Sequence, residues 1–200
     1  MLEPRARFLI VCEGGKTEPI YFRALCKDQR LTAAEVRVCG EECGSHPGSV
    51  VASAKQERDE AREPFDHVWC VFDRDEHEGV ESVREDARQS RLHVAFSNPC
   101  FEIWFRLHFE FSTAPIERDD VISDLGKPRF LGAYEKSADV YPDLLESQPT
   151  AIANARKLRK YHNDVNEGRP ENPYTDVDVL VTELSDLAAM SLPTPGRESS

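Results

Sequence analysis

The stretch that decides the fold is IVCEGGKTEP, residues 10–19. An apolar run ends there on an acid, Glu13, and two glycines, a lysine and a signal for the start of a helix follow. The stretch HVWCVFDRDEH, residues 67–77, repeats this pattern with Asp73 and Asp75. Two apolar strands are therefore expected to deliver carboxylates into the loops that follow them.

The first hundred residues alternate between short apolar runs and segments with helical periodicity. Strands are expected at about 6–12, 34–40, 66–73 and 92–97, and helices from Thr17 and at about 49–62, 79–90 and 99–109. We expect Thr17 to be the N-cap of the first helix. This alternation predicts an α/β fold, with a parallel sheet of about four strands flanked by helices.

The second half of the chain predicts helices and no further strand. These helices are expected at 116–126, 149–164 and 174–190, the last of them capped by Thr175 or Asp176. The expected organisation is an α/β core at 1–111, a mostly helical extension packed on it at 112–190, and a frayed tail at 191–200.

Composition restricts the class of protein. The chain has 200 residues and a net charge of −12. No apolar run is long enough to cross a membrane and no signal-peptide core is present, so we expect a cytoplasmic protein with reduced cysteines. The negative charge disfavours long-range attraction to nucleic acid. A nucleic-acid substrate would therefore require a local basic patch, a bound cation or a basic partner.

The acids after the two strands form the principal candidate site. Loops at the carboxyl ends of parallel strands gather at one edge of the sheet. If the strand order is 2-1-3-4, then Glu13, Asp73 and Asp75 face one crevice, where their mutual repulsion would favour a divalent cation. Carboxylate oxygens at an open site suit Mg²⁺ or Mn²⁺. The alternative is that these acids cap the next helix or only face water.

The loop after the first strand offers two further binding candidates. Gly14 would permit close approach of the backbone to a ligand. Lys16 is expected either to contact a phosphate or to be solvated. The pattern G-x-x-x-x-G-K-[ST] is absent, so this loop is not a P-loop.

Five stretches together resemble one family. They are FLIVCEGGKTEPIYF (8–22), VWCVFDRDEH (68–77), SNPCFEIWFRLHF (97–109), YEKSADVYP (134–142) and NPYTDVDVLVTEL (172–184). A strand ending in Glu-Gly and another ending in D-x-D resemble the Toprim fold of primases, topoisomerases and OLD-type nucleases. The five blocks, in their order, resemble the RloB family over about residues 6–188.

The resemblance implies a function. RloB-like proteins occur in bacterial and archaeal anti-phage loci, commonly beside an AAA-type or ABC-type ATPase, and related Toprim effectors are metal-dependent nucleases, some acting on tRNA. Glu13 matches the Toprim glutamate, as an acid/base or as a metal ligand, and Asp73 and Asp75 match the D-x-D. The zinc and DNA-gate modules of primases and topoisomerases are missing, so those activities are not expected.

Three other residues are candidates near these motifs. Glu102 could point into the site as a fourth acid, or form a surface ion pair with Arg106 one turn later. Lys136 lies in a loop of mixed aromatic and basic residues and could contact a phosphate or a leaving group. His77 follows the D-x-D and could be a ligand, a proton donor or a solvated side chain. His108 is expected to pack rather than to act.

The stretch ARKLRKYH, residues 155–162, holds the one dense basic patch of the sequence. Arg156, Lys157, Arg159 and Lys160 are expected either to form a solvated helix face or to contact a nucleic-acid backbone.

Two functions therefore compete. The first is a metal-dependent nuclease that cleaves RNA, such as tRNA, or DNA as the effector of an anti-phage abortive-infection system with an ATPase partner. The second is a non-catalytic sensor or assembly subunit of an ATPase defence complex. The sequence leaves open whether the protein forms a homo-oligomer. Nucleotidyl transfer of the primase type is a third and less favoured reading.

Overall fold

A computed structural model describes residues 6–32, 34–38, 46–74 and 79–190. Its first half alternates strands and helices: β1 (Phe8–Cys12), α1 (Thr17–Asp28), β2 (Ala34–Val38), α2 (Pro47–Glu60), β3 (His67–Asp73), α3 (Val80–Gln89), β4 (His93–Asn98) and α4 (Glu102–Arg106). The second half contains α5 (Arg118–Leu125), α6 (Tyr141–Leu144), the 3₁₀ helix η2 (Leu145–Ser147), α7 (Gln148–Val165), β5 (Tyr174–Thr175) and α8 (Val177–Met190). The tail at 191–200 lies outside the described residues.

The strands form one sheet in the order β2-β1-β3-β4-β5. The first four are parallel, which confirms the predicted α/β fold and the 2-1-3-4 order. Ile10 of β1 lies opposite Trp69 of β3, and Asp73 of β3 lies opposite Ser97 of β4. This register brings the carboxyl ends of β1 and β3 to the same edge of the sheet.

The expectation that no strand follows residue 112 is wrong. Tyr174 and Thr175 form β5, which pairs antiparallel with the end of β4. Two residues are too few to show the alternation by which strands are recognised in a sequence. The last helix was predicted to be capped by Thr175 or Asp176. It begins at Val177, directly after Asp176, and Thr175 Oγ1 accepts a hydrogen bond from the Val177 amide at 3.2 Å.

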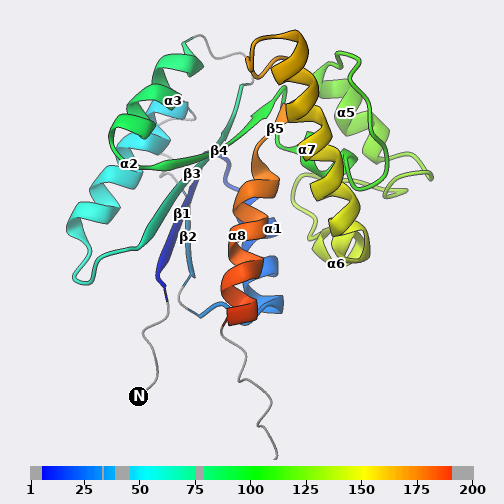
Figure 1. Ribbon diagram of the computed structural model, residues 1–200. Helices are drawn as coiled ribbons and strands as arrows, with labels where there is room; N and C mark the ends of the chain where they lie inside the picture. Colours follow the sequence, from blue (N-terminus) through cyan, green and yellow to red (C-terminus); the bar gives the residue numbers. More distant parts are fainter. Residues whose placement is uncertain (1–5, 33, 39–45, 75–78, 191–200) are drawn as a thin grey trace, which may run out of the picture.

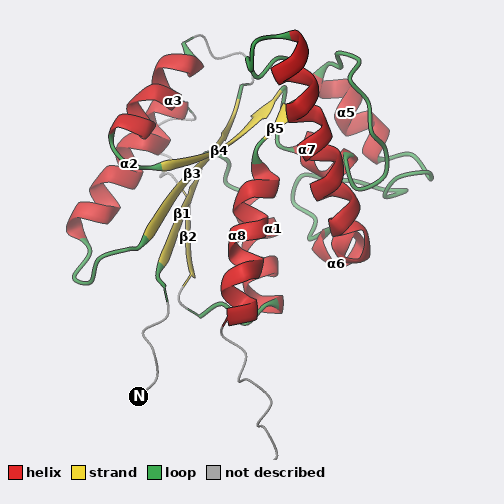
Figure 2. Cartoon of the chain, in the orientation of Figure 1, coloured by secondary structure: helices red, strands yellow, loops and turns green. Residues whose placement is uncertain are grey.

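Helices cover both faces of the sheet (Figures 1 and 2). Side chains alternate along β1: Leu9 and Val11 pack with α2 and α3, while Phe8, Ile10 and Cys12 pack with α1, α4 and the later helices. The apolar cluster that contains Phe8, Ile10 and Cys12 continues through α5, α7 and α8. The division into a core at 1–111 and an extension at 112–190 stays a prediction, but the two halves share this apolar cluster.

Four of the described cysteines are thiols in the apolar interior. Cys12, Cys26, Cys70 and Cys100 are buried and form no disulfide. Within the described ranges, no helix combines the length and the apolar character needed to cross a membrane.

An aromatic cluster joins α1 to α4. The Tyr21 ring, 2 % exposed, packs edge-on against Phe101 and Trp104, with ring centroids 5.9 and 6.4 Å apart, and also contacts Phe105 and Tyr141. Its hydroxyl accepts a hydrogen bond from Gln148 Nε2 at 3.3 Å. Since α1 and α4 begin at the carboxyl edge of the sheet, this cluster fixes the positions of the two loops there.

We expect Tyr21→Ala to lower the free energy of unfolding by about 3–5 kcal/mol, because it leaves a large cavity among aromatic rings. Tyr21→Phe keeps the ring and removes one hydrogen bond, so it should cost only about 1 kcal/mol. Urea denaturation of both variants measures the difference. Equal losses in the two variants would contradict a packing role for the ring.

Candidate functional site

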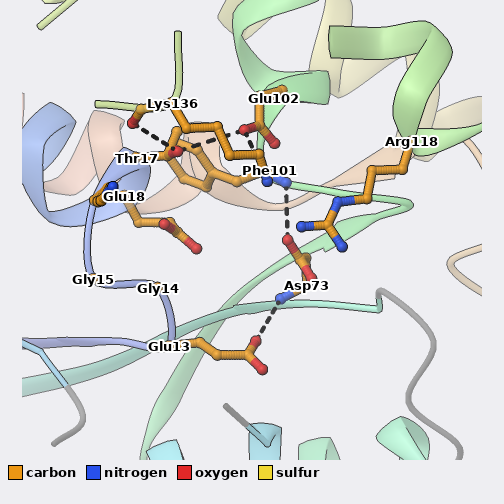
Figure 3. A pocket seen from close by; sticks show the side chains of 11 residues that line it. Glu13, Gly14, Gly15, Thr17, Glu18, Asp73, Phe101, Glu102, Arg118 and Lys136 are labelled. Carbon is orange, nitrogen blue, oxygen red and sulfur yellow. Dashed lines mark hydrogen bonds and ion pairs between the residues drawn. The ribbon is translucent and has the colours of Figure 1, made fainter. Parts of the chain in front are cut away.

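A pocket of about 400 Å³ opens at the carboxyl edge of the sheet (Figure 3). Six of the predicted site residues line it: Glu13, Gly14, Lys16, Asp73, Glu102 and Lys136. Five further lining residues were not predicted as site residues: Gly15, Thr17, Glu18, Phe101 and Arg118. The pocket therefore gathers residues from both halves of the chain.

Glu13 and Asp73 are held close together by the ends of their strands. The Glu13 amide donates to the Val71 carbonyl at 2.9 Å, which extends the pairing of β1 with β3 by one residue. The Glu13 carboxylate in turn accepts a hydrogen bond from the Asp73 amide at 3.4 Å. Asp73 Oδ2 accepts from the Phe101 amide at 3.3 Å, so the loop before α4 helps to orient it (Figure 3).

Glu102 enters the pocket rather than pairing with Arg106. Its side chain is 2 % exposed, and Oε1 accepts a hydrogen bond from the Tyr134 hydroxyl at 3.0 Å and lies 3.7 Å from Lys136 Nζ. Burial and the neighbouring Glu102 raise the Tyr134 pKa, which keeps this hydroxyl a donor. Arg106 instead bonds Asp124, with Nε 3.3 Å from Oδ2.

Thr17 is not the N-cap of α1. That position belongs to Lys16, whose side chain makes no capping bond, and Thr17 is the first residue of the helix. The Thr17 hydroxyl lies 3.2 Å from the Lys136 carbonyl and 3.5 Å from Glu102 Oε1. Long-range partners have replaced the local capping bond on which the prediction relied, and Thr17 fixes the 134–136 loop to α1.

Glu18 occupies the space next to Gly14. A Cβ atom on Gly14 would lie 2.3 Å from Glu18 Oε2, so any larger residue there would collide with this carboxylate. Glu18 is 7 % exposed, and burial is the main cause that raises its pKa above the usual 4.5, with a smaller contribution from Glu102. A larger residue at position 14 would therefore need the Glu18 carboxylate, the end of a flexible side chain, to move. The predicted contact of Gly14 with a ligand stays a prediction.

The basic residues of the predicted patch lie elsewhere, on α7, and none of them lines the pocket. Arg159 Nη2 donates to Asp178 Oδ2 at 2.8 Å, and this carboxylate on α8 is 1 % exposed. Lys160 pairs with Asp164 at 3.0 Å, and Lys157 Nζ lies 5.8 Å from the centre of the Phe111 ring. Arg156 is exposed. Nucleic-acid contact by these residues stays a prediction.

Asp75 and His77 fall outside the described residues. Within the described ranges, no three His, Cys, Asp or Glu side chains are grouped as a metal site. The donors that are described fit the predicted cation in kind, because Glu13 and Asp73 offer only carboxylate oxygens beside a polar pocket. These two, with Asp75 by sequence, would hold Mg²⁺ or Mn²⁺.

His108 packs away from the pocket, as expected. Its Nδ1 lies 2.9 Å from the Trp104 carbonyl, and its ring meets the Trp104 ring edge-on at 4.8 Å. Burial lowers the His108 pKa to about 4, so the ring is neutral at physiological pH.

The buried Glu18 gives a pH prediction. The folded protein holds the Glu18 proton more tightly than the unfolded chain does, so its stability falls as pH rises above 4.5 toward the raised pKa. In EDTA, Glu18→Gln should therefore be more stable than the wild type at about pH 7, and the gain should vanish near pH 4. The exposed Glu146→Gln is the control. Thermal unfolding at both pH values measures this, and a gain that is the same at both would contradict it.

Arg159 gives a stability prediction. Arg159→Ala leaves the buried Asp178 without its guanidinium partner and should lower the free energy of unfolding by about 3 kcal/mol. The matched variant Arg156→Ala removes an exposed arginine from the same helix and should change it by less than about 0.5 kcal/mol. Urea denaturation compares them, and equal small losses would show that the Arg159–Asp178 pair adds little.

Comparison with known proteins identifies the family. Comparisons with curated proteins and with solved structures give no match. A family model described as RloB-like protein matches residues 8–184, a range that includes the strand ends, the pocket residues of both halves and most of α8. The chain belongs to the RloB-like protein family.

Proposed function

We propose that this protein is a metal-dependent nuclease that hydrolyses phosphodiester bonds in RNA, such as tRNA, or in DNA. The observation that carries the proposal is the convergence of Glu13 and Asp73 from neighbouring parallel strands on one pocket that also contains Lys16 and Lys136. Carboxylates that can hold a divalent cation, with lysines beside them, suit a phosphodiester substrate.

Four described pocket residues have a proposed part in this chemistry. Glu13 and Asp73 would hold the cation, together with Asp75, which the D-x-D motif adds by sequence and which lies outside the described residues. A bound Mg²⁺ or Mn²⁺ would supply an activated water and stabilise the departing oxygen. Glu102 is buried with its carboxylate toward Lys136, so it orients the ammonium group on the opposite side of the pocket. Lys136 then meets the negative charge of the substrate.

The proposal extends to a cellular role, which family membership supports. We propose that the protein is the effector of a bacterial or archaeal anti-phage abortive-infection system and is regulated by an AAA-type or ABC-type ATPase. Membership of the RloB-like family supports this role. A nuclease that stops cell growth has to be restrained until infection, and an ATPase partner is the expected means.

The test is Asp73→Asn. This change keeps an oxygen that can accept the Phe101 amide but removes the charge needed for the cation. Calorimetry should show loss of Mg²⁺ or Mn²⁺ binding, and cleavage of tRNA or plasmid DNA should fall by at least about a hundredfold. Asp119→Asn changes an exposed acid that does not line the pocket and is the matched control.

The alternative predicts another result. A sensor or assembly subunit would bind its ATPase partner equally well with or without Asp73. Neither Asp73→Asn nor Asp119→Asn would then change cell growth when the two proteins are produced together. Cleavage that persists in Asp73→Asn would instead show that the nuclease site lies elsewhere.

A further inference from the structure

The pocket has two walls of opposite charge. Glu13 and Asp73 come from the ends of β1 and β3, while Arg118 and Lys136 come from the chain after residue 112 (Figure 3). In a protein with a net charge of −12, these two cations lie beside the carboxylates at the carboxyl edge of the sheet. The α/β core supplies the two strand-end acids and Lys16, and the chain after residue 112 supplies the other two cations.

Arg118 is the first residue of α5, and that helix is firmly placed. Val121 and Leu125 are fully buried in the main apolar cluster. Asp124, on the same helix, accepts hydrogen bonds from Arg106 Nε at 3.3 Å and from Lys127 Nζ at 2.6 Å. Packing and ion pairs thus fix the backbone from which the Arg118 side chain extends.

The Arg118 side chain reaches from α5 into the pocket. Its guanidinium lies on the side of the Asp73 carboxylate, across from the Gly14–Gly15 loop (Figure 3). A guanidinium presents several N–H donors in one plane and can bind two oxygens of a phosphate at once. Arg118 is half-buried, so part of its surface remains accessible to a ligand.

Lys136 is held in a similar way. The Thr17 hydroxyl binds its carbonyl at 3.2 Å, and its Nζ lies 3.7 Å from Glu102 Oε1. The Lys136 side chain nevertheless stays 40 % exposed. Its backbone is therefore anchored while its ammonium group can still meet an anion.

We propose that Arg118 and Lys136 together bind a backbone phosphate of a nucleic acid, with Arg118 as the principal contact. A phosphate that approaches Glu13 and Asp73 is repelled by two carboxylates, and the basic wall offsets this repulsion. The inference rests on the proposed nuclease function for the identity of the anion. It assigns a substrate-binding residue that the sequence motifs did not indicate, and it makes α5 a part of the site.

The experiment measures binding of fluorescein-labelled oligo(U) RNA by anisotropy, in EDTA, over a series of salt concentrations. Arg118→Ala should weaken binding about tenfold. It should also reduce the slope of log K against log salt by about one, the sign of a lost phosphate contact. Arg118→Lys keeps the charge and should retain the slope with an intermediate affinity.

The matched control is Arg129→Ala. Arg129 belongs to the same part of the chain, is 62 % exposed and does not line the pocket. This variant should bind with the wild-type slope, and thermal unfolding should show all three variants folded. The inference would be overturned if Arg118→Ala and Arg129→Ala bound the RNA with the same affinity and the same slope of log K against log salt. Failure of the wild type to bind would overturn it too, since these contacts need no metal.

The result separates this inference from the nuclease proposal. Wild-type protein that binds RNA through Arg118 but cleaves neither RNA nor DNA would leave the inference standing and remove the nuclease. Cleavage that depends on Asp73 but is unchanged in Arg118→Ala would support the nuclease proposal and overturn the inference about Arg118.

Discussion

The burial of one carboxylate, that of Glu102, ties the pocket together. A charge that is 2 % exposed is costly unless hydrogen bonds and an opposite charge compensate it. The compensating groups come from separate parts of the chain: Thr17 at the start of α1, and Tyr134 and Lys136 in the loop between α5 and α6. Satisfying Glu102 therefore places this loop against the α/β core, and the basic wall of the pocket depends on that placement.

This arrangement shows how an acidic protein can offer a site to an anion. The net negative charge of the molecule opposes the approach of a nucleic acid. The cations that line the pocket act on a phosphate over the few ångströms that matter for binding. Burial raises the pKa of Glu18, so this acid gains its negative charge at a higher pH than an exposed glutamate does. Lys16, Arg118 and Lys136 line the same pocket as the two carboxylates at the strand ends.

The sequence predicted the parts of the site that depend on local pattern. Apolar strands that end in acids predicted the meeting of Glu13 and Asp73, because parallel strands with that order share one edge. Arg118 could not be found in this way, since it lies in a polar stretch without a motif and reaches the pocket only through the packing of α5. The same limit explains β5, which exists only because β4 offers it an edge.

The helical extension therefore contributes residues to the pocket, namely Arg118 and Lys136. Val121, Leu125 and Leu184, all after residue 112, share one apolar cluster with Phe8 and Ile10 of β1. Movement of α5 relative to the sheet would break this packing and withdraw Arg118, while leaving the strand-end acids and Lys136 in place. A protein could therefore keep Glu13 and Asp73 and still lack the proposed phosphate contact. The strand-end acids alone do not define the activity.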